Sequence, residues 1–223
     1  MTFRARHTFG ALRELDKRAR FGSMVTATGS LTSRANVSAA PKIKGVIVLD
    51  SLKSIRARGG DAELARILSH LGSEARKVFE APIYPWEWYS LDAFTEFLEA
   101  DIRETASGVA EVLVGRAEKV IESQLRGVYR IFVKLGSPGY VVRRIASVHQ
   151  TYFDDSKIIA EIEGDSATIQ YIGFKARHRI LEYTIIGFYR KALEISGAKK
   201  IDVRFSVPMS DDKDYSELSI SWG

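Results

Sequence analysis

The chain has 223 residues, of which 45% are apolar and 27% are charged, values typical of a globular protein with a substantial core. It contains no cysteine, which excludes disulfides, thiolate metal sites and cysteine nucleophiles. We find no apolar run of roughly 18 residues, the length of a membrane-spanning helix, and no charged-then-apolar leader, so we expect a cytoplasmic protein.

The net charge of +5 is concentrated near the N-terminus. Residues 1–44 hold nine lysines and arginines against two acidic residues, a net of +7, so the remaining residues sum to −2. The segment 9–21 has the pattern of a basic amphipathic helix, and Gly, Ser, Thr and Ala dominate 22–42, as in a linker. We predict a basic flexible arm and linker over 1–42 and a single domain over 43–223. Contact with nucleic acid or a membrane surface would depend on the arm.

The first part of the predicted domain has the apolar spacing and the capping residues of successive helices. Gly59-Gly60 interrupts the first apolar segment, Ser90 is placed to cap a later helix, and Ser137-Pro138 has the cap and first-turn proline of another. The helices are expected, in chain order, over about 46–58, 61–71, 73–80, 91–102, 108–135 and 138–149.

The apolar period changes to two after residue 155. Segments 157–163 and 167–173 alternate around Gly164-Asp165, which predicts a hairpin. A helix is expected over about 177–196, and the alternating segments 200–207 and 218–222 predict a second hairpin. The expected fold is therefore α+β: N-terminal helices followed by ββαββ with a four-stranded antiparallel sheet.

Two groups of residues could bind a ligand or a partner. Tyr84, Trp86, Trp88 and Tyr89 lie in a proline-interrupted loop, where their rings could line a pocket, form a binding hot spot or cover the ends of the helices.

The second group is basic. Arg126, Tyr129 and Arg130 share one stripe of the predicted helix, and Arg143-Arg144 could join them in a cradle for an anion. The same residues could equally form a solvated surface with their aliphatic stems packed against the domain.

The segments 126–144, 150–155 and 173–179 and the final hairpin ending in Trp222 resemble an uncharacterised protein family found mainly in myxobacteria. The resemblance covers roughly residues 43–223. The order of elements also resembles a wider superfamily that includes the four-vinyl-reductase domain, the haem nitric-oxide/oxygen-binding domain and the Bet3-like tethering subunits. Members of that superfamily are sensors or assembly subunits, so the resemblance implies a ligand-binding or scaffolding module.

The haem-binding branch gives one specific hypothesis. Its proximal histidine follows a proline-started helix, and His149 stands at the corresponding place in this chain. Its Tyr-x-Ser-x-Arg motif for the haem propionates corresponds to Tyr171, Gly173 and Lys175, so the serine and the arginine are missing. An imidazole can bind iron and a lysine with a phenol could meet a propionate. Alternatively, His149 is simply a partly buried histidine at the end of a helix.

We find none of the familiar nucleotide-binding, zinc-protease or serine-hydrolase motifs in the sequence. We therefore expect a non-enzymatic sensory or signalling module that binds a small hydrophobic ligand between helices and sheet. Three alternatives stay open: a scaffold or adaptor subunit acting as a homodimer through its surfaces, a haem sensor using His149, and an enzyme without a recognised motif.

Overall fold

The computed structural model describes residues 41–124, 136–154 and 156–223, all within one compact unit, Ser38–Gly223. The predicted arm up to residue 40, the predicted helical continuation over 125–135 and the candidate residues Arg126, Tyr129 and Arg130 lie outside the described residues. Among the described helices, none is long and apolar enough to cross a membrane.

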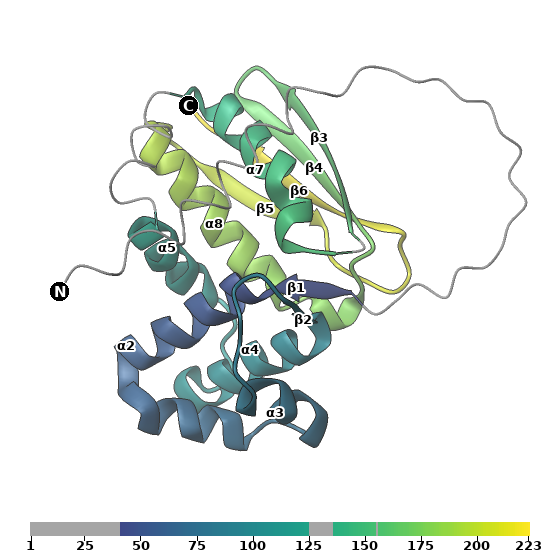
Figure 1. Ribbon diagram of the computed structural model, residues 1–223. Coiled ribbons are helices and arrows are strands. Elements are labelled where there is room, and N and C mark those ends of the chain that lie inside the picture. The colour runs from purple at the N-terminus through teal and green to yellow at the C-terminus, as the bar shows by residue number, and fades with distance from the viewer. Residues whose placement is uncertain (1–40, 125–135, 155) are drawn as a thin grey trace, which may run out of the picture. The chain divides into compact units, whose positions relative to one another are not determined.

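Helices build the first part of the unit (Figure 1). They are α2 (Gly45–Ser69), α3 (Ser73–Glu80), α4 (Leu91–Ala106) and α5 (Val112–Gln124). Helix α4 packs against α2 and α3 through the buried face that its apolar spacing predicts. Its N-cap is Ser90, whose hydroxyl accepts a hydrogen bond of 3.2 Å from the Ala93 amide, as the sequence predicts.

Helix α2 is two helical segments joined across a kink. Gly60 adopts a φ of 70°, which side-chain-bearing residues rarely adopt, so the helix bends where the Gly59-Gly60 pair predicts a break. Asp61, the first residue after the kink, accepts a hydrogen bond of 2.8 Å from Arg56.

A small sheet that the sequence does not predict lies beside these helices. Strand β1 (Lys42–Lys44) pairs antiparallel with β2 (Trp88–Ser90), so the predicted aromatic loop ends in a strand and the predicted linker ends in another. Each strand has only three residues, too few for an alternating pattern to be recognised.

The main sheet confirms the predicted ββαββ architecture. Its strands are β3 (Lys157–Glu163), β4 (Ser166–Ile172), β5 (Asp202–Val207) and β6 (Tyr215–Ser221), all antiparallel in the order β3-β4-β6-β5. Residues at every second position of β4 and β6 are buried, as the alternation predicts.

Two helices pack on this sheet (Figure 1). Helix α7 (Pro138–Tyr152) contacts β3 and β4, and α8 (Leu181–Ser196) contacts β5 and α7. A short 3-10 helix, η1 (Ala176–His178), precedes α8, and Gly197 ends α8 in the left-handed conformation. The α7 helix continues one turn beyond its predicted end, so His149 lies inside its last turn rather than at its end.

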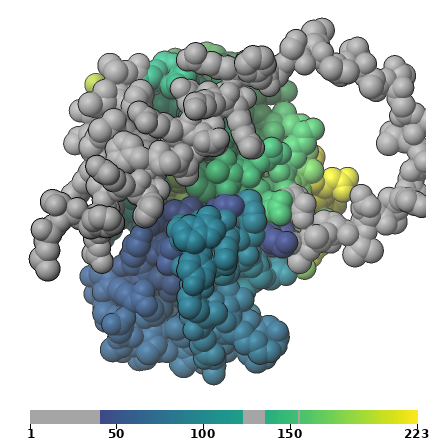
Figure 2. Space-filling view, in the orientation of Figure 1, coloured from purple at the N-terminus to yellow at the C-terminus, as the bar shows by residue number. Residues whose placement is uncertain are grey.

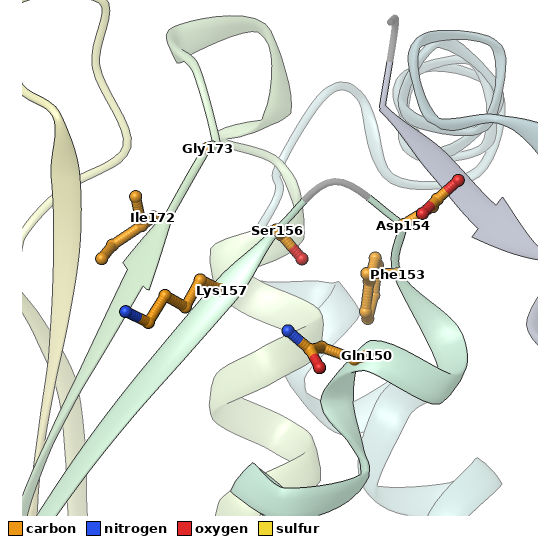
Figure 3. Close-up of a pocket in the computed structure, with 7 residues that line it drawn as sticks. All are labelled: Gln150, Phe153, Asp154, Ser156, Lys157, Ile172 and Gly173. Atoms are coloured by element: carbon orange, nitrogen blue, oxygen red, sulfur yellow. The ribbon is translucent and has the colours of Figure 1, made fainter. Parts of the chain in front are cut away.

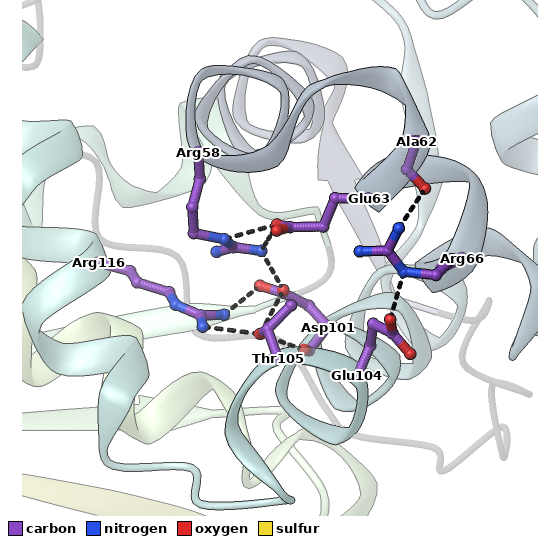
Figure 4. A network of polar contacts seen from close by, with 8 residues as sticks. All are labelled: Arg58, Ala62, Glu63, Arg66, Asp101, Glu104, Thr105 and Arg116. Carbon is purple, nitrogen blue, oxygen red and sulfur yellow. Dashed lines mark hydrogen bonds and ion pairs between the residues drawn. The ribbon is translucent and has the colours of Figure 1, made fainter.

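A buried carboxylate links three of the helices (Figure 4). The Asp101 side chain on α4 accepts hydrogen bonds of 2.6 Å from Arg58 on α2 and 2.6 Å from Arg116 on α5. Arg116 also donates to Thr105, and Arg58 also binds Glu63. Because Asp101 is only 3% exposed, its charge depends on these two arginines for compensation.

Helices α5 and α8 pack closely at Gly187. A Cβ atom at this position would overlap the Val114 carbonyl oxygen and would lie 3.0 Å from the Ala117 Cβ. We predict that Gly187→Ala lowers the free energy of unfolding by about 1–3 kcal/mol, because the two helices must move apart. Chemical denaturation followed by circular dichroism measures this change.

Gly115 on α5 offers a matched control. A Cβ at this helical position meets nothing within 4 Å. Gly115→Ala should therefore stabilise the fold by up to about 1 kcal/mol through helix propensity. Equal effects of the two substitutions would contradict the close packing of α5 on α8.

Candidate functional site

The last turn of α7 holds a buried histidine. The helix begins at the predicted cap, where the Ser137 hydroxyl accepts a hydrogen bond of 3.3 Å from the Tyr140 amide. His149, in the last turn, is 7% exposed, and its Nε2 lies 2.7 Å from the Oγ of Ser156. Ser156 is itself buried and stands immediately before β3. This hydrogen bond links the end of α7 to the beginning of the sheet.

Aromatic side chains enclose the rest of the His149 imidazole. Phe153 stacks on it with ring centroids 4.7 Å apart, and Tyr171 and Phe174 approach at 5.6 Å and 5.8 Å. Tyr171 points inward because it occupies a buried position of β4. Gly173 then turns the chain with a φ of 98°, which brings Phe174 back against the same imidazole. We call His149, Ser156, Phe153, Tyr171 and Phe174 the histidine cluster.

Burial keeps this cluster uncharged. Loss of solvation lowers the pKa of His149 to about 4, so the imidazole is neutral at neutral pH. Burial also raises the pKa of the Tyr171 phenol well above its ordinary value. Tyr189 on α8 lies near this phenol, and its own hydroxyl is buried without a hydrogen-bond partner of standard geometry among the described residues. The cluster thus offers hydrogen-bonding groups without charge.

A second buried histidine supports the turn after β4. The Nε2 of His178 lies 2.7 Å from the Asp92 carboxylate on α4, and its Nδ1 accepts a hydrogen bond of 3.4 Å from the Lys175 amide. Nε2 therefore carries the proton of the neutral ring and donates a hydrogen bond to the Asp92 carboxylate. Both ring nitrogens are used, so His178 fixes the turn rather than offering a binding group.

An open groove runs along the outer side of the histidine cluster (Figure 3). It has a volume of about 520 Å³ and lies between the end of α7 and the open end of the β3–β4 hairpin, where β3 begins and β4 ends. Its lining residues are Gln150, Phe153, Asp154, Ser156, Lys157, Ile172 and Gly173. Phe153 and Ser156 belong both to the groove and to the histidine cluster, so a molecule in the groove would touch the groups that hold His149.

The structure brings some of the predicted site residues together and separates others. Tyr171, offered from the resemblance as a partner for a haem propionate, lies against His149. Lys175 is half-buried two residues past the turn, at the start of η1. The loop residues Tyr84, Trp86, Trp88 and Tyr89 line neither the groove nor the histidine cluster.

The aromatic loop is instead a surface feature, crossing the front of the helical part in Figures 1 and 2. The Trp86 side chain is 67% exposed and stacks on Tyr84 at 5.5 Å, and the Lys44 ammonium lies 4.0 Å from the centre of the Trp88 ring. The hydroxyl of Tyr89 accepts a hydrogen bond of 2.8 Å from the Tyr84 amide. These contacts fix the loop and leave most of the Trp86 side chain in solvent.

Sequence reasoning missed Ser156, Phe153 and Phe174. A serine after two aspartates has the pattern of an ordinary turn, and the two phenylalanines have the pattern of core residues. The only signal in the sequence was the partial match to the Tyr-x-Ser-x-Arg motif at Tyr171 and Lys175. This match indicates that the turn after β4 is of interest, but it does not show which side chains pack there.

Comparison with solved structures shows that this fold is similar to the fold of several H-NOX proteins. An H-NOX protein from S. oneidensis in the Fe(II)NO ligation state superposes with a TM-score of 0.60 at 13% sequence identity, over 81% of this chain and 99% of that chain. The Fe(II) unliganded H-NOX protein from K. algicida gives 0.58 at 13% identity, over 81% and 97%. An oxygen-binding H-NOX domain related to soluble guanylate cyclases, in its oxygen complex, gives 0.55 at 16% identity, over 81% and 95%. No protein-family model and no curated protein matches the sequence.

The residues of the histidine cluster do not fit a haem. The His149 Nε2 is already in a short hydrogen bond with a buried hydroxyl, and three rings pack around the imidazole. An axial ligand needs a ring nitrogen that faces the iron. In addition, Gly173 has no hydroxyl for a propionate. Among the described residues, no group of three or more His, Cys, Asp or Glu side chains could hold another metal ion.

Proposed function

We propose that the chain is a non-enzymatic sensory module that has the H-NOX fold and works without haem. A small ligand would bind in the groove beside the histidine cluster, where α7 meets the β3–β4 hairpin. The observation that carries this proposal is the 2.7 Å hydrogen bond between the His149 Nε2 and Ser156, which occupies one of the two ring nitrogens that could bind iron.

The location supports a sensory role. The histidine cluster joins α7 and β4 to the turn before α8, so packed rings connect the groove with both α7 and this turn. His149 and Tyr171 are neutral and enclosed, which suits them to hold a shape rather than to transfer protons at neutral pH. We propose a partly polar ligand where the sequence analysis expects a small hydrophobic one, because Gln150, Asp154 and Lys157 give the groove polar walls.

Native mass spectrometry of protein purified from its own host tests this proposal. We expect a fraction of the chain to retain a small organic molecule and to release no haem on denaturation. Haem released in amounts equal to the protein would contradict the proposal, and so would fresh protein that never carries a small molecule at any collision energy.

The exposed aromatic loop favours a second function, a scaffold that acts through its surface. Trp86 and Tyr84 have the residue types of interface hot spots and lie open to solvent. If this loop forms a homodimer interface, sedimentation should show a dimer for the wild type and a monomer for Trp86→Ala. A strictly monomeric wild type at high concentration would contradict the homodimer.

A further inference from the structure

We infer that two copies of this chain associate edge to edge through β3, with the two strands antiparallel and Ala160 at the twofold axis. The two main sheets then form one continuous sheet. The inference does not rest on the proposed function, because it needs no ligand. Three observations support it: the free edge of β3, the incomplete burial of its apolar side chains and the positions of its charges.

Strand β3 is one edge of the main sheet, whose order is β3-β4-β6-β5 (Figure 1). All of its residues, Lys157–Glu163, pair with β4 in an unbroken register. On its other side, no strand among the described residues pairs with it. A regular edge of this length presents backbone groups on which a further strand can form.

The hairpin turn determines which backbone groups face the free side of β3. Glu163 pairs with Ser166 across a two-residue turn, and such a closing pair exchanges backbone hydrogen bonds. Hydrogen-bonding direction alternates along an antiparallel strand. The amides and carbonyls of the even-numbered residues Ile158, Ala160 and Ile162 therefore point away from β4, toward the free side.

The same three residues carry apolar side chains that are only partly covered. They lie on the helix face of the sheet but are half-buried, whereas the β4 residues opposite them are at most 4% exposed. Helix α7 contacts β3, and a Cβ on its Gly139 would lie 3.2 Å from the Ile162 side chain. The helix thus covers β3 from the face, and a strand beside β3 would complete the burial.

The opposite edge of the sheet is less suited to pairing. Strand β5 has a register shift between Phe205 and Val207, and Pro208 follows it directly. Irregularities and prolines of this kind prevent edge-to-edge association. Strand β3 has neither, so β3 is the edge that a partner would use.

The charges of β3 favour a second copy of the same strand as the partner. The exposed face has Lys157 at one end and Glu161 and Glu163 at the other. Among the described residues, none of these three side chains forms an ion pair. In an antiparallel pair centred on Ala160, Lys157 of each copy lies opposite Glu163 of the other and diagonal to Glu161. Opposite charges in these positions stabilise a sheet.

The centre at Ala160 also fits the apolar residues and the backbone. Ile158 of one copy then lies opposite Ile162 of the other on the helix face, and the free amides and carbonyls meet across the axis. A centre at Glu161 would place two glutamates directly opposite each other, which is destabilising. A centre at Ile159 would leave the last two residues of each strand unpaired.

Sedimentation equilibrium of the full-length chain at low ionic strength tests the inference. The wild type should be a dimer in equilibrium with the monomer. Lys157→Glu and Glu163→Lys should each weaken dimerisation at least about tenfold, because each places like charges opposite each other. The double variant exchanges the two charges and should regain the wild-type dissociation constant within about threefold.

Lys119→Glu is the matched control. It makes the same change of charge at an exposed lysine of α5, away from β3, and should leave dimerisation unchanged. Trp86→Ala changes the aromatic loop, and a dimer formed through β3 should survive it. Circular dichroism shows that each variant keeps its fold.

Single cysteines test the register, because the chain has no cysteine of its own. Residues paired across the axis have Cα atoms about 5.5 Å apart, within the range of a disulfide. Ala160→Cys should therefore form a disulfide-linked dimer on mild oxidation. Ile159→Cys should not, because in this register it lies opposite Glu161 of the second copy.

Three results would overturn the inference. The first is a wild type that stays monomeric at about 1 mM. The second is a dimer that the charge variants do not weaken, or that the double variant does not restore. The third is cross-linking at Ile159→Cys in preference to Ala160→Cys. None of these results bears on the haem-free sensor, which haem recovered from host-purified protein would contradict on its own.

Discussion

Asp101→Asn is expected to lower the free energy of unfolding by about 3 kcal/mol, because it removes the charge shared by two arginines inside the helical part. The carboxylate lies 2.6 Å from each guanidinium, and its side chain is 5% exposed. The Arg58 and Arg116 side chains are 30% and 21% exposed, so water compensates part of the loss. The expected loss is therefore at the lower end of the values for broken buried pairs.

The exposed pair of Asp61 and Arg56 is the control for Asp101. Their separation, 2.8 Å, is similar, but the Asp61 side chain is 88% exposed. Asp61→Asn should therefore cost less than about 1 kcal/mol. Urea denaturation of both variants measures the contrast, and losses of the same size would show that Asp101 does not hold α2, α4 and α5 together.

Acidification from pH 7 to pH 4 is expected to remove about 3 kcal/mol of unfolding free energy through His149 alone. Its pKa is about 4 in the folded chain because burial disfavours the charged form, against about 6.5 for an exposed histidine in the unfolded chain. Between these values the unfolded chain binds a proton that the folded chain rejects. The stabilisation is complete above pH 6.5 and is lost as the pH falls toward 4.

Comparison with a His149→Gln variant isolates this contribution. Glutamine does not titrate, so the free energy of unfolding of the variant should decline less between pH 6.5 and 4 than that of the wild type. Some decline should remain, because burial also lowers the pKa of His178. Denaturation midpoints across this pH range give the two slopes. Identical slopes would mean that His149 is exposed to water or already charged in the folded chain.

Much of the fold could be predicted because local signals and tertiary packing agree. The alternation in 157–163 and 167–173 predicts the first hairpin, and Ser90 and Ser137 mark helix starts that the structure confirms. The β1–β2 pair could not be predicted, because three-residue strands are defined by pairing between segments far apart in the sequence.

The candidate site was less predictable for a similar reason. The sequence identifies His149 and Tyr171 as residues that could bind a ligand, but their role depends on which side chains pack around them. Ser156, which forms a hydrogen bond with the His149 Nε2, lies in the connection between α7 and β3. No rule of sequence spacing links the two residues. The resemblance to haem-binding domains predicts the correct fold, whereas the hydrogen bond of the histidine argues against the cofactor.

Titration of the purified full-length chain with hemin under reducing conditions, followed by absorption spectroscopy, tests the central claim most directly. His149→Ala is measured beside it, so that a specific axial bond can be separated from non-specific adsorption. A haem-free module should give no saturable Soret band that depends on His149. A sharp band that saturates at one haem per chain and is lost in His149→Ala would contradict the haem-free sensor.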